Sequence, residues 1–405
     1  MLQSLLRLLQ ILRLWETLTK LSIQLDYFFR KTIRLIFLTV LLFSFYGCNK
    51  TRKAKAESSV SFAGLDFTET VPVSFAGQFT IKKTAGYSVI NISGEKPVLV
   101  VEKDFPLPSG VPADYVVLVK PLLKTYLVSS SAFDFFAKLN ILDKVKFSGS
   151  KKENMFLPEV RQYMEDGKIT YAGKYSAPDF ETLYAEGTDI SIQNTMIFHK
   201  PEIKEKLEQL KIPVIVEKKK KKKNPLGRIE WIKLYGLLYD KEKEAEDFFN
   251  ARQAEFNSLN KSAGSRNTIA FFYFTSSGSV NVRKPGDYIT TAIAMAGGTY
   301  FMDAAADNES VLSTMNMLPE DFYVKAKDAD ILIYNSTIEG MIEDRELLLQ
   351  KFPLLKDFKG FKNGRLYCTD KKLFQETTGS VGFMQDLVSV MNHKEENLHY
   401  LIKIK

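Results

Sequence analysis

The sequence is poor in the side chains that usually bind transition metals. Its 405 residues include two cysteines and three histidines. Cys48 and Cys368 lie far apart without a CxxC spacing, and the histidines at positions 199, 393 and 399 are not paired at ligand spacing. We therefore expect neither a metal site built from protein side chains nor a bound cofactor.

Motifs that mark common enzyme classes are also missing. The chain has no GxSxG, no HExxH, no P-loop and no GxGxxG after a strand. No nucleophile is paired with a histidine base. These absences argue against an enzyme.

The positive charge is not spread over the chain. The formal net charge is +8, but residues 1–47 hold six basic and two acidic side chains, and Lys218–Lys223 adds six lysines. The remainder is slightly negative, so the diffuse basic face that binds nucleic acid is absent. For the lysine run, three interpretations stay open: a solvated loop, a sequence artefact, or the anion-attracting rim of a binding cleft.

The N-terminal region resembles an export signal. Arg30, Lys31 and Arg34 precede the apolar run 35–45, which is shorter than the ~20 residues needed to cross a bilayer. The run ends at Gly47-Cys48, which resembles a bacterial lipobox. We expect cleavage before Cys48, a lipid on its thiol, and a location on the outer side of a membrane; the alternative is a short uncleaved anchor. The true start is expected near Leu25.

Strands and helices alternate along most of the remaining sequence. Strands are expected at 87–92, 97–101, 115–119, 126–128, 169–171, 189–192, 212–216, 268–274, 299–302, 330–334 and 365–369. Helices are expected at 155–166, 178–186, 201–210, 226–238, 241–259, 285–296, 319–327, 343–358 and 380–391. Short strands that alternate with helices of about ten residues favour parallel sheets covered on both faces.

The fold predicted from this pattern is α/β, with two Rossmann-like lobes, one long bridging helix, and a ligand cleft between the lobes. The expected divisions are a signal peptide at 1–47, a tether at 48–64, an N-terminal lobe at 65–235, a bridging helix at 236–264 and a C-terminal lobe at 265–405.

Several segments resemble one family of transport proteins. They are 173–183 followed by 188–192, the stretch 224–233, the loop 283–288 and the segment 322–334. Their order and spacing are similar to those of the iron-siderophore, haem and cobalamin class of ABC substrate-binding proteins. The resemblance implies a monomeric receptor that takes a small metal chelate to a permease and its ATPase. An iron(III)-siderophore is the favoured cargo; cobalamin, haem, a free metal ion and, less favoured, a lipoprotein enzyme are the alternatives.

The resemblance also implies acidic docking residues, one on each lobe. The matching positions are Glu181 in the first lobe and Glu320 or Asp321 in the second. Exposed carboxylates near helix starts can meet arginines of a permease, where charge complementarity sets the register. The alternative interpretation is that each of these acidic residues is a solvated side chain at the start of a helix, without a docking role.

Ligand contacts are expected at strand-end loops. A chelate that is anionic and aromatic calls for arginines and aromatic rings. The candidates are Arg228, Arg283, Tyr175, Tyr288, Ser130 and Trp231, with Ser129, Ser131 and Met196 nearby. Arg228 could instead pair with Glu230, and Trp231 could instead pack in the core.

Overall fold

The computed structural model describes residues 60–62, 64–218, 224–262, 267–302, 313–342 and 344–405. The predicted signal peptide, Cys48, most of the tether and residues 219–223 of the lysine run lie outside these ranges. Within them, no helix combines the length and the apolar character needed to cross a membrane.

The described chain begins with a sheet of its own. A short hairpin, β1 (Val60–Phe62) and β2 (Leu65–Phe67), precedes the five-stranded sheet ordered β3-β4-β5-β6-β7. Its strands are β3 (Glu69–Val71), β4 (Phe79–Thr84), β5 (Tyr87–Ile92), β6 (Val98–Val101) and β7 (Val116–Val119). The strands expected at 87–92, 97–101 and 115–119 are therefore present, but β3–β6 pair antiparallel and only β6–β7 is parallel.

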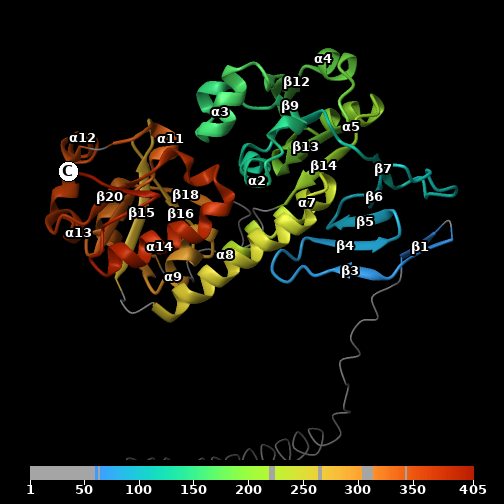
Figure 1. Ribbon diagram of the computed structural model, residues 1–405. Helices are drawn as coiled ribbons and strands as arrows, with labels where there is room; N and C mark the ends of the chain where they lie inside the picture. Colours follow the sequence, from blue (N-terminus) through green and yellow to red (C-terminus); the bar gives the residue numbers. More distant parts are fainter. Residues whose placement is uncertain (1–59, 63, 219–223, 263–266, 303–312, 343) are drawn as a thin grey trace, which may run out of the picture. The chain divides into compact units, whose positions relative to one another are not determined.

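A parallel five-stranded sheet follows, in the order β10-β9-β8-β13-β14. The strands are β8 (Thr125–Leu127), β9 (Val145–Ser148), β10 (Thr170–Tyr171), β13 (Ile190–Asn194) and β14 (Val214–Glu217). Its helices are α2 (Phe133–Lys138), α3 (Pro158–Glu165), α4 (Phe180–Ala185) and α5 (Pro201–Gln209), and β11 (Gly173–Lys174) pairs with β12 (Ala177–Pro178) before α4. The chain builds outward from β8 in one direction and from β13 in the other, so the sheet reverses its order between these strands. Figure 1 shows β9, β13 and β14 of this sheet with α2, α3, α4 and α5 around them.

Helices α6 (Pro225–Ile229), α7 (Ile232–Leu238) and α8 (Glu242–Ser262) come next. The single helix expected at 226–238 is wrong, because the chain breaks at Glu230 and Trp231. Glu230 is fully buried and accepts the backbone N–H groups of Ser74, Phe75 and Ala76, which joins this break to the N-terminal sheet. Helix α8 packs against α7 on one side and the C-terminal helix α14 (Ser380–Met391) on another.

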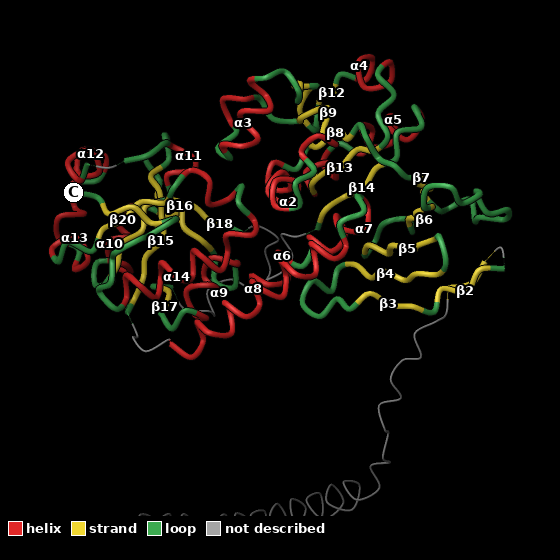
Figure 2. Tube along the Cα trace, in the orientation of Figure 1, coloured by secondary structure: helices red, strands yellow, loops and turns green. Residues whose placement is uncertain are grey.

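The last sheet is mixed, in the order β18-β16-β15-β19-β20-β21, with β17 also on β15. Figure 2 shows β15, β16, β18 and β20 of this sheet with α10, α13 and α14 beside them. Its strands are β15 (Thr268–Phe274), β16 (Val280–Arg283), β17 (Thr299–Tyr300), β18 (Thr314–Met317), β19 (Ile331–Tyr334), β20 (Leu366–Thr369) and β21 (Leu401–Lys403). Its other helices are α9 (Tyr288–Met295), α10 (Pro319–Ala326), α11 (Ser336–Glu339), α12 (Arg345–Lys351) and α13 (Lys359–Lys362). Strands β15, β19 and β20 are parallel, whereas β16, β18 and β21 run antiparallel to their neighbours.

Candidate functional site

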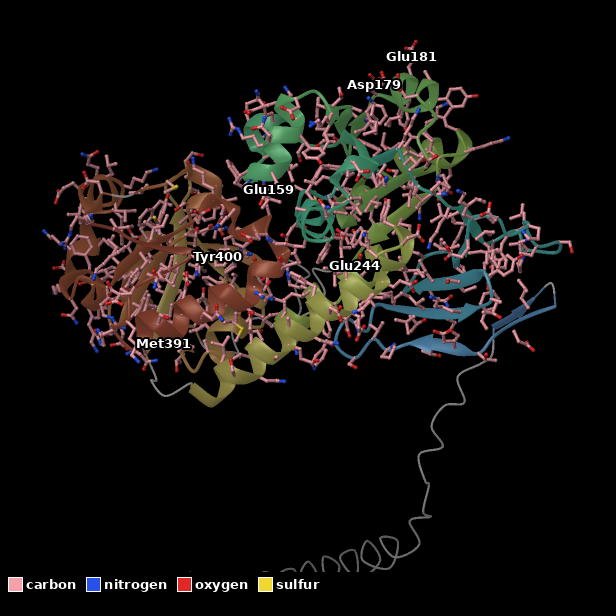
Figure 3. The ribbon with its side chains drawn as sticks, in the orientation of Figure 1. Glu159, Asp179, Glu181, Glu244, Met391 and Tyr400 are labelled. Carbon is pink, nitrogen blue, oxygen red and sulfur yellow. The ribbon has the colours of Figure 1, made fainter. Side chains whose placement is uncertain are left out.

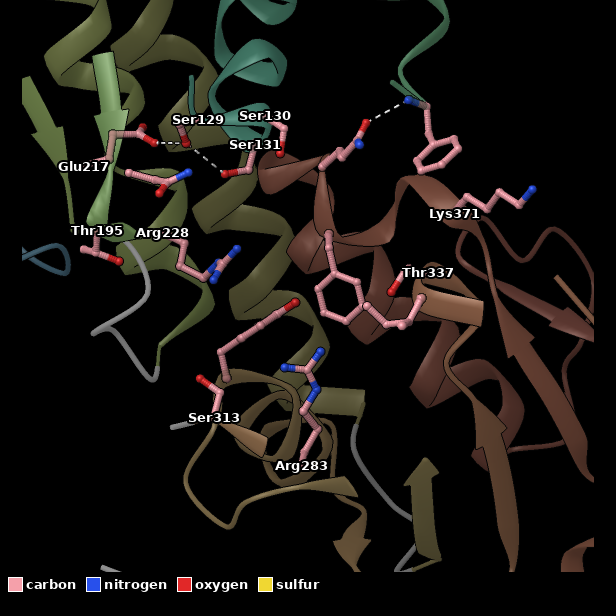
Figure 4. Close-up of a pocket in the computed structure, with 16 residues that line it drawn as sticks. Ser129, Ser130, Ser131, Thr195, Glu217, Arg228, Arg283, Ser313, Thr337 and Lys371 are labelled. Carbon is pink, nitrogen blue, oxygen red and sulfur yellow. Dashed lines mark hydrogen bonds between the residues drawn. The ribbon is translucent and has the colours of Figure 1, made fainter. Parts of the chain in front are cut away.

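A cavity of about 410 Å³ lies where loops of the parallel sheet meet loops of the C-terminal sheet (Figure 4). On one side its lining follows the carboxyl ends of β8, β13 and β14. On the other it follows those of β19 and β20, together with the end of β16. The lining residues are Ser129, Ser130, Ser131, Phe156, Asn194, Thr195, Glu217, Arg228, Arg283, Tyr288, Ser313, Thr337, Ile338, Lys371, Phe374 and Gln375. The cavity thus occupies the usual ligand position of an open α/β sheet, beyond the carboxyl ends of the strands.

Hydroxyl groups and one carboxylate form the first wall of the cavity. Ser129 follows β8 and donates its hydroxyl to Glu217 Oε2 at 2.5 Å, while the Ser131 hydroxyl lies 3.4 Å from that of Ser129. The phenol of Tyr235, on α7, donates to the other carboxylate oxygen of Glu217. Burial and the charge of Glu217 raise the pKa of Tyr235 well above its ordinary value, so this phenol stays protonated and donates.

Two arginines enter the same cavity from different elements. Arg228 lies in α6, whose start is fixed by the Asn224 side chain accepting the N–H of Leu226. Arg283 ends β16, and its backbone carbonyl accepts the Tyr300 hydroxyl at 2.9 Å. The close-up in Figure 4 draws both guanidinium groups inside the pocket.

A tyrosine ring connects these two charges. The Arg228 guanidinium carbon lies 4.1 Å from the centroid of the Tyr288 ring, and that of Arg283 lies 6.0 Å from it. The Phe374 ring lies 4.7 Å from the Arg283 guanidinium and meets Tyr288 edge to face at 6.1 Å. Stacking on an aromatic ring stabilises a planar guanidinium group. It leaves the N–H groups at the edge of that plane, where they can donate hydrogen bonds.

The polar atoms of this cluster are incompletely satisfied. Arg228 is 7% exposed, and its Nε is buried without a hydrogen-bond partner. The Tyr288 hydroxyl is also buried and unpartnered. Burial raises the pKa of Tyr288 to about 12, although the two nearby arginines act in the opposite direction. Among the residues that the structure describes, the acidic neighbour of Arg283 is Asp287, at 3.9 Å.

Direct contacts join the segments on the two sides of the cavity. The Gln375 side chain accepts the N–H of Phe156 and donates to the carbonyl of Asn154. The Thr377 hydroxyl donates to the carbonyl of Ser131 at 2.8 Å. Residues that line the cavity therefore also hold its two walls together.

The structure brings most of the predicted ligand contacts together but separates three of them. Arg228, Arg283, Tyr288 and Ser129–Ser131 line the cavity. Trp231 is fully buried in the core, where its ring lies 4.9 Å from that of Phe79. The alternative prediction, that Trp231 packs in the core, is therefore correct. Tyr175 packs against the cluster under α4, and Met196 is 36% exposed; neither lines this cavity.

Other lining residues were not singled out from the sequence. Glu217 is the last residue of β14, and this position at the carboxyl end of a parallel strand was the available signal. Phe374 and Gln375 come from a short 3-10 segment after β20, Lys371–Phe374, and the residue that follows it. The alternative pairing of Arg228 with Glu230 is wrong, because Glu230 faces the backbone of residues 74–76.

The acidic residues expected at a docking surface are exposed on helices. Glu181 lies in the first turn of α4 and extends outward in Figure 3. Glu320 and Asp321 both lie in the first turn of α10 and are exposed. All three are therefore accessible to a partner.

Comparison with known proteins assigns the family. The profile of the periplasmic binding protein family matches residues 128–373, and the chain belongs to this family. Its members are substrate-binding transport proteins and not enzymes. An uncharacterized lipoprotein of Methanocaldococcus jannaschii is 25% identical over 305 residues, which are 71% of this chain and 69% of that protein.

Solved structures share the two-lobe fold at low sequence identity. The periplasmic heme binding protein HutB of Vibrio cholerae is 14% identical with a TM-score of 0.54, covering 66% of this chain and 99% of that one. The petrobactin-binding protein YclQ of Bacillus subtilis is 16% identical with a TM-score of 0.54, covering 69% and 95%. These similarities confirm the predicted α/β, two-lobe architecture.

Proposed function

We propose that this chain is the extracytoplasmic receptor of an ABC importer and that it captures an anionic metal chelate, with a ferric siderophore as the favoured cargo. The observation that carries the proposal is Arg228. Its guanidinium is buried against Tyr288, lines the cavity, and forms no ion pair with any residue in the described ranges.

A buried cation without a partner is costly, because burial removes the water that solvates its charge. An anionic group in the cavity would compensate Arg228 and could also reach Arg283. Catecholate and carboxylate oxygens suit the guanidinium N–H groups, and aryl rings suit the faces of Tyr288 and Phe374. The name of one similar structure, a petrobactin-binding protein, supports a siderophore as cargo.

Haem is the second candidate. Its support is the buried, unpartnered hydroxyl of Tyr288, since a tyrosine oxygen can ligate haem iron. HutB, named for heme binding, shares the fold. A visible absorption spectrum after titration with haem distinguishes this candidate: a specific one-to-one spectrum that Tyr288→Phe abolishes would favour it over the chelate.

The test of the chelate uses Arg228→Met, which keeps an unbranched apolar stem and removes the guanidinium charge. We expect the dissociation constant for a ferric catecholate to rise about tenfold to a hundredfold, the range for a charge-assisted contact. Arg161→Met is the control, since Arg161 is exposed on α3 and pairs with Glu165. Equal affinity in the Arg228 variant and the control would refute the assignment of Arg228.

Delivery to the permease and attachment to the membrane complete the proposal. Glu181 on α4 and Glu320 or Asp321 on α10 are the proposed docking carboxylates, supported by their exposure at helix starts. Lipid attachment at Cys48 is supported by the Gly47-Cys48 sequence after the apolar run, and by the similarity to a protein named as a lipoprotein.

A further inference from the structure

A loop of the N-terminal sheet presents consecutive apolar side chains to solvent. Residues 102–115 connect β6 to β7 and extend past the ends of these strands (Figure 1). Phe105 is 44% exposed, Leu107 is 62% exposed, and Pro106 between them is exposed as well. Single exposed apolar residues are common on soluble proteins, but three in a row on a loop that is held in place indicate a contact surface.

Contacts with β5 and with the turn before it fix this loop. The Phe105 ring meets the ring of Tyr87 edge to face, with 5.6 Å between centroids, and the Tyr87 hydroxyl donates to the Pro106 carbonyl at 2.8 Å. A Cβ on Gly86 would lie 2.0 Å from the Phe105 ring, so this ring packs directly on bare backbone. The free side of Phe105 and the Leu107 side chain are therefore held at the surface before a partner arrives.

The cargo cavity does not account for this loop. The loop lies before residues 128–373, which match the family profile, and none of its residues lines the cavity beside Arg228. The partner has to be sought on the side of the molecule where the loop lies.

The chain enters the described structure beside this loop. Val60, the first described residue, pairs with Phe67 across the β1–β2 hairpin. Phe67 and Tyr87 belong to one hydrophobic cluster, against which residues of the loop also pack. The segment from Cys48 to Val60 spans at most about 40 Å when fully extended. A lipid on Cys48 would thus keep the bilayer within that distance of Val60, next to the loop.

We propose that Phe105, Pro106 and Leu107 form a membrane-contact site, which inserts into the surface of the bilayer that holds the lipid of Cys48. This inference rests on the proposed lipid attachment. Attachment at Cys48 makes the second contact intramolecular, so even a weak affinity of the loop for lipid is enough to hold it at the surface. The loop thereby orients the receptor on its membrane.

The contact is apolar rather than electrostatic. Lys103 and Asp104 beside the tip are exposed and carry opposite charges, and Glu102 pairs with Lys120 at 2.8 Å. The loop therefore lacks the cluster of basic residues that draws proteins to anionic lipids. We expect contact with zwitterionic as well as anionic bilayers, at low and at high salt.

A fluorescent label on the loop tests the contact. Ser109→Cys places a thiol at an exposed position of the loop, whereas Cys368 is buried and Cys48 would be acylated. The chain is purified from membranes, labelled with an environment-sensitive dye, and reconstituted in phosphatidylcholine liposomes that contain doxyl-labelled lipid. We expect blue-shifted emission and quenching at position 109. The control is Leu354→Cys in the C-terminal lobe, where the native side chain is 41% exposed and the dye should show neither effect.

Substitutions of Leu107 identify the side chain that inserts. In the Ser109→Cys background, Leu107→Asp should remove the blue shift and the quenching, because a carboxylate opposes insertion into lipid. Leu107→Phe should retain both. The affinity of Leu107→Asp for a chelate should equal that of the unmodified chain, since Leu107 does not line the cavity.

The other outcomes each overturn a defined part of the proposal. A chain that does not float with the liposomes overturns the lipid attachment and this inference with it. A chain that floats without quenching at position 109 overturns the inference and leaves the attachment standing. Quenching that persists in Leu107→Asp, or that needs anionic lipid at low salt, overturns the apolar insertion. A blue shift that appears only when a permease is present assigns the loop to that protein and overturns the membrane contact.

Discussion

The buried carboxylate of Asp134 gives a pH-dependent test of the contact between the two sides of the cavity. Asp134 lies in α2 and is 1% exposed, and its Oδ2 accepts the N–H of Thr378 at 2.6 Å. Burial raises the pKa of Asp134 from 3.8 to about 6. The hydrogen bond from Thr378 and the charge of Lys138 oppose the increase, and Glu376 adds to it.

The direction of the effect on stability follows from the raised pKa. Because the folded protein holds this proton more tightly than the unfolded chain, the stabilising contribution is complete below about pH 4 and is lost as the pH rises through about 6. The difference between 3.8 and about 6 corresponds to about 3 kcal/mol of destabilisation when the carboxylate is charged.

The substitution Asp134→Asn removes the charge and keeps an oxygen that can accept the N–H of Thr378. We expect the free energy of unfolding at pH 8 to rise by up to about 3 kcal/mol, and the gain to disappear near pH 4. Urea unfolding between pH 4 and pH 8 measures it. Asp143→Asn is the control, since that side chain is 57% exposed.

Two results would refute this reasoning about Asp134. One is an Asp134→Asn variant that is less stable than the unmodified chain at pH 8. The other is a difference between the two proteins that stays constant from pH 4 to pH 8. A further variant, Asp134→Ala, leaves the buried N–H of Thr378 without an acceptor and should lose about 1–3 kcal/mol relative to Asp134→Asn.

Three other predictions concern the fold, the permease and the membrane. Glu230→Ala removes the acceptor of three backbone N–H groups, at 2.8, 2.6 and 2.6 Å, and should lower the free energy of unfolding by about 3 kcal/mol or more in urea, whereas Glu230→Gln should lose less. Glu181→Lys combined with Glu320→Lys and Asp321→Lys should reduce chelate uptake by cells and leave chelate affinity unchanged; equal loss with Glu159→Lys would contradict a specific docking role. Cys48→Ser should move the protein from the membrane fraction to the soluble fraction and abolish its labelling with radioactive palmitate; membrane retention without label would favour the uncleaved anchor.

Sequence patterns predicted those helices and strands whose formation depends mainly on residues close together in the chain. The strand Thr268–Phe274 and the helix Ser380–Met391 lie where they were expected, with the same bounds. A β-branched and aromatic run fixes the first, and an apolar periodicity fixes the second. The α/β class and the position of the cavity at strand ends follow from the same alternation.

The differences arise where distant residues decide the local structure. The break between α6 and α7 depends on Glu230 meeting the backbone of residues 74–76, more than 150 positions away. Strand β16 follows β15 directly and pairs with it antiparallel, so this pair has no helix of the kind that parallel pairing requires. Strand β18, which comes after α9 and β17, pairs antiparallel with β16. Trp231 directly precedes α7 and is fully buried in the core, where its ring contacts that of Phe79.

The composition of the site was predictable only in part. Arg228, Arg283 and Tyr288 were identifiable as charge and stacking partners, because their residue types suit an anionic aromatic ligand. Glu217 was not identified as a lining residue, because a glutamate next to a run of lysines is expected to be exposed to solvent at the end of a strand. Its place in the cavity wall, with hydrogen bonds from Ser129 and Tyr235, depends on elements that are distant in the sequence.

The central claim is that the cavity beside Arg228 holds a metal chelate. Crystals of the chain grown with a ferric catecholate, measured at the iron absorption edge, would locate the metal directly. We expect one strong anomalous peak inside the cavity, with the chelate's anionic oxygens against Arg228 and Arg283. An empty cavity in the presence of saturating chelate, or an iron bound elsewhere on the surface, would contradict it.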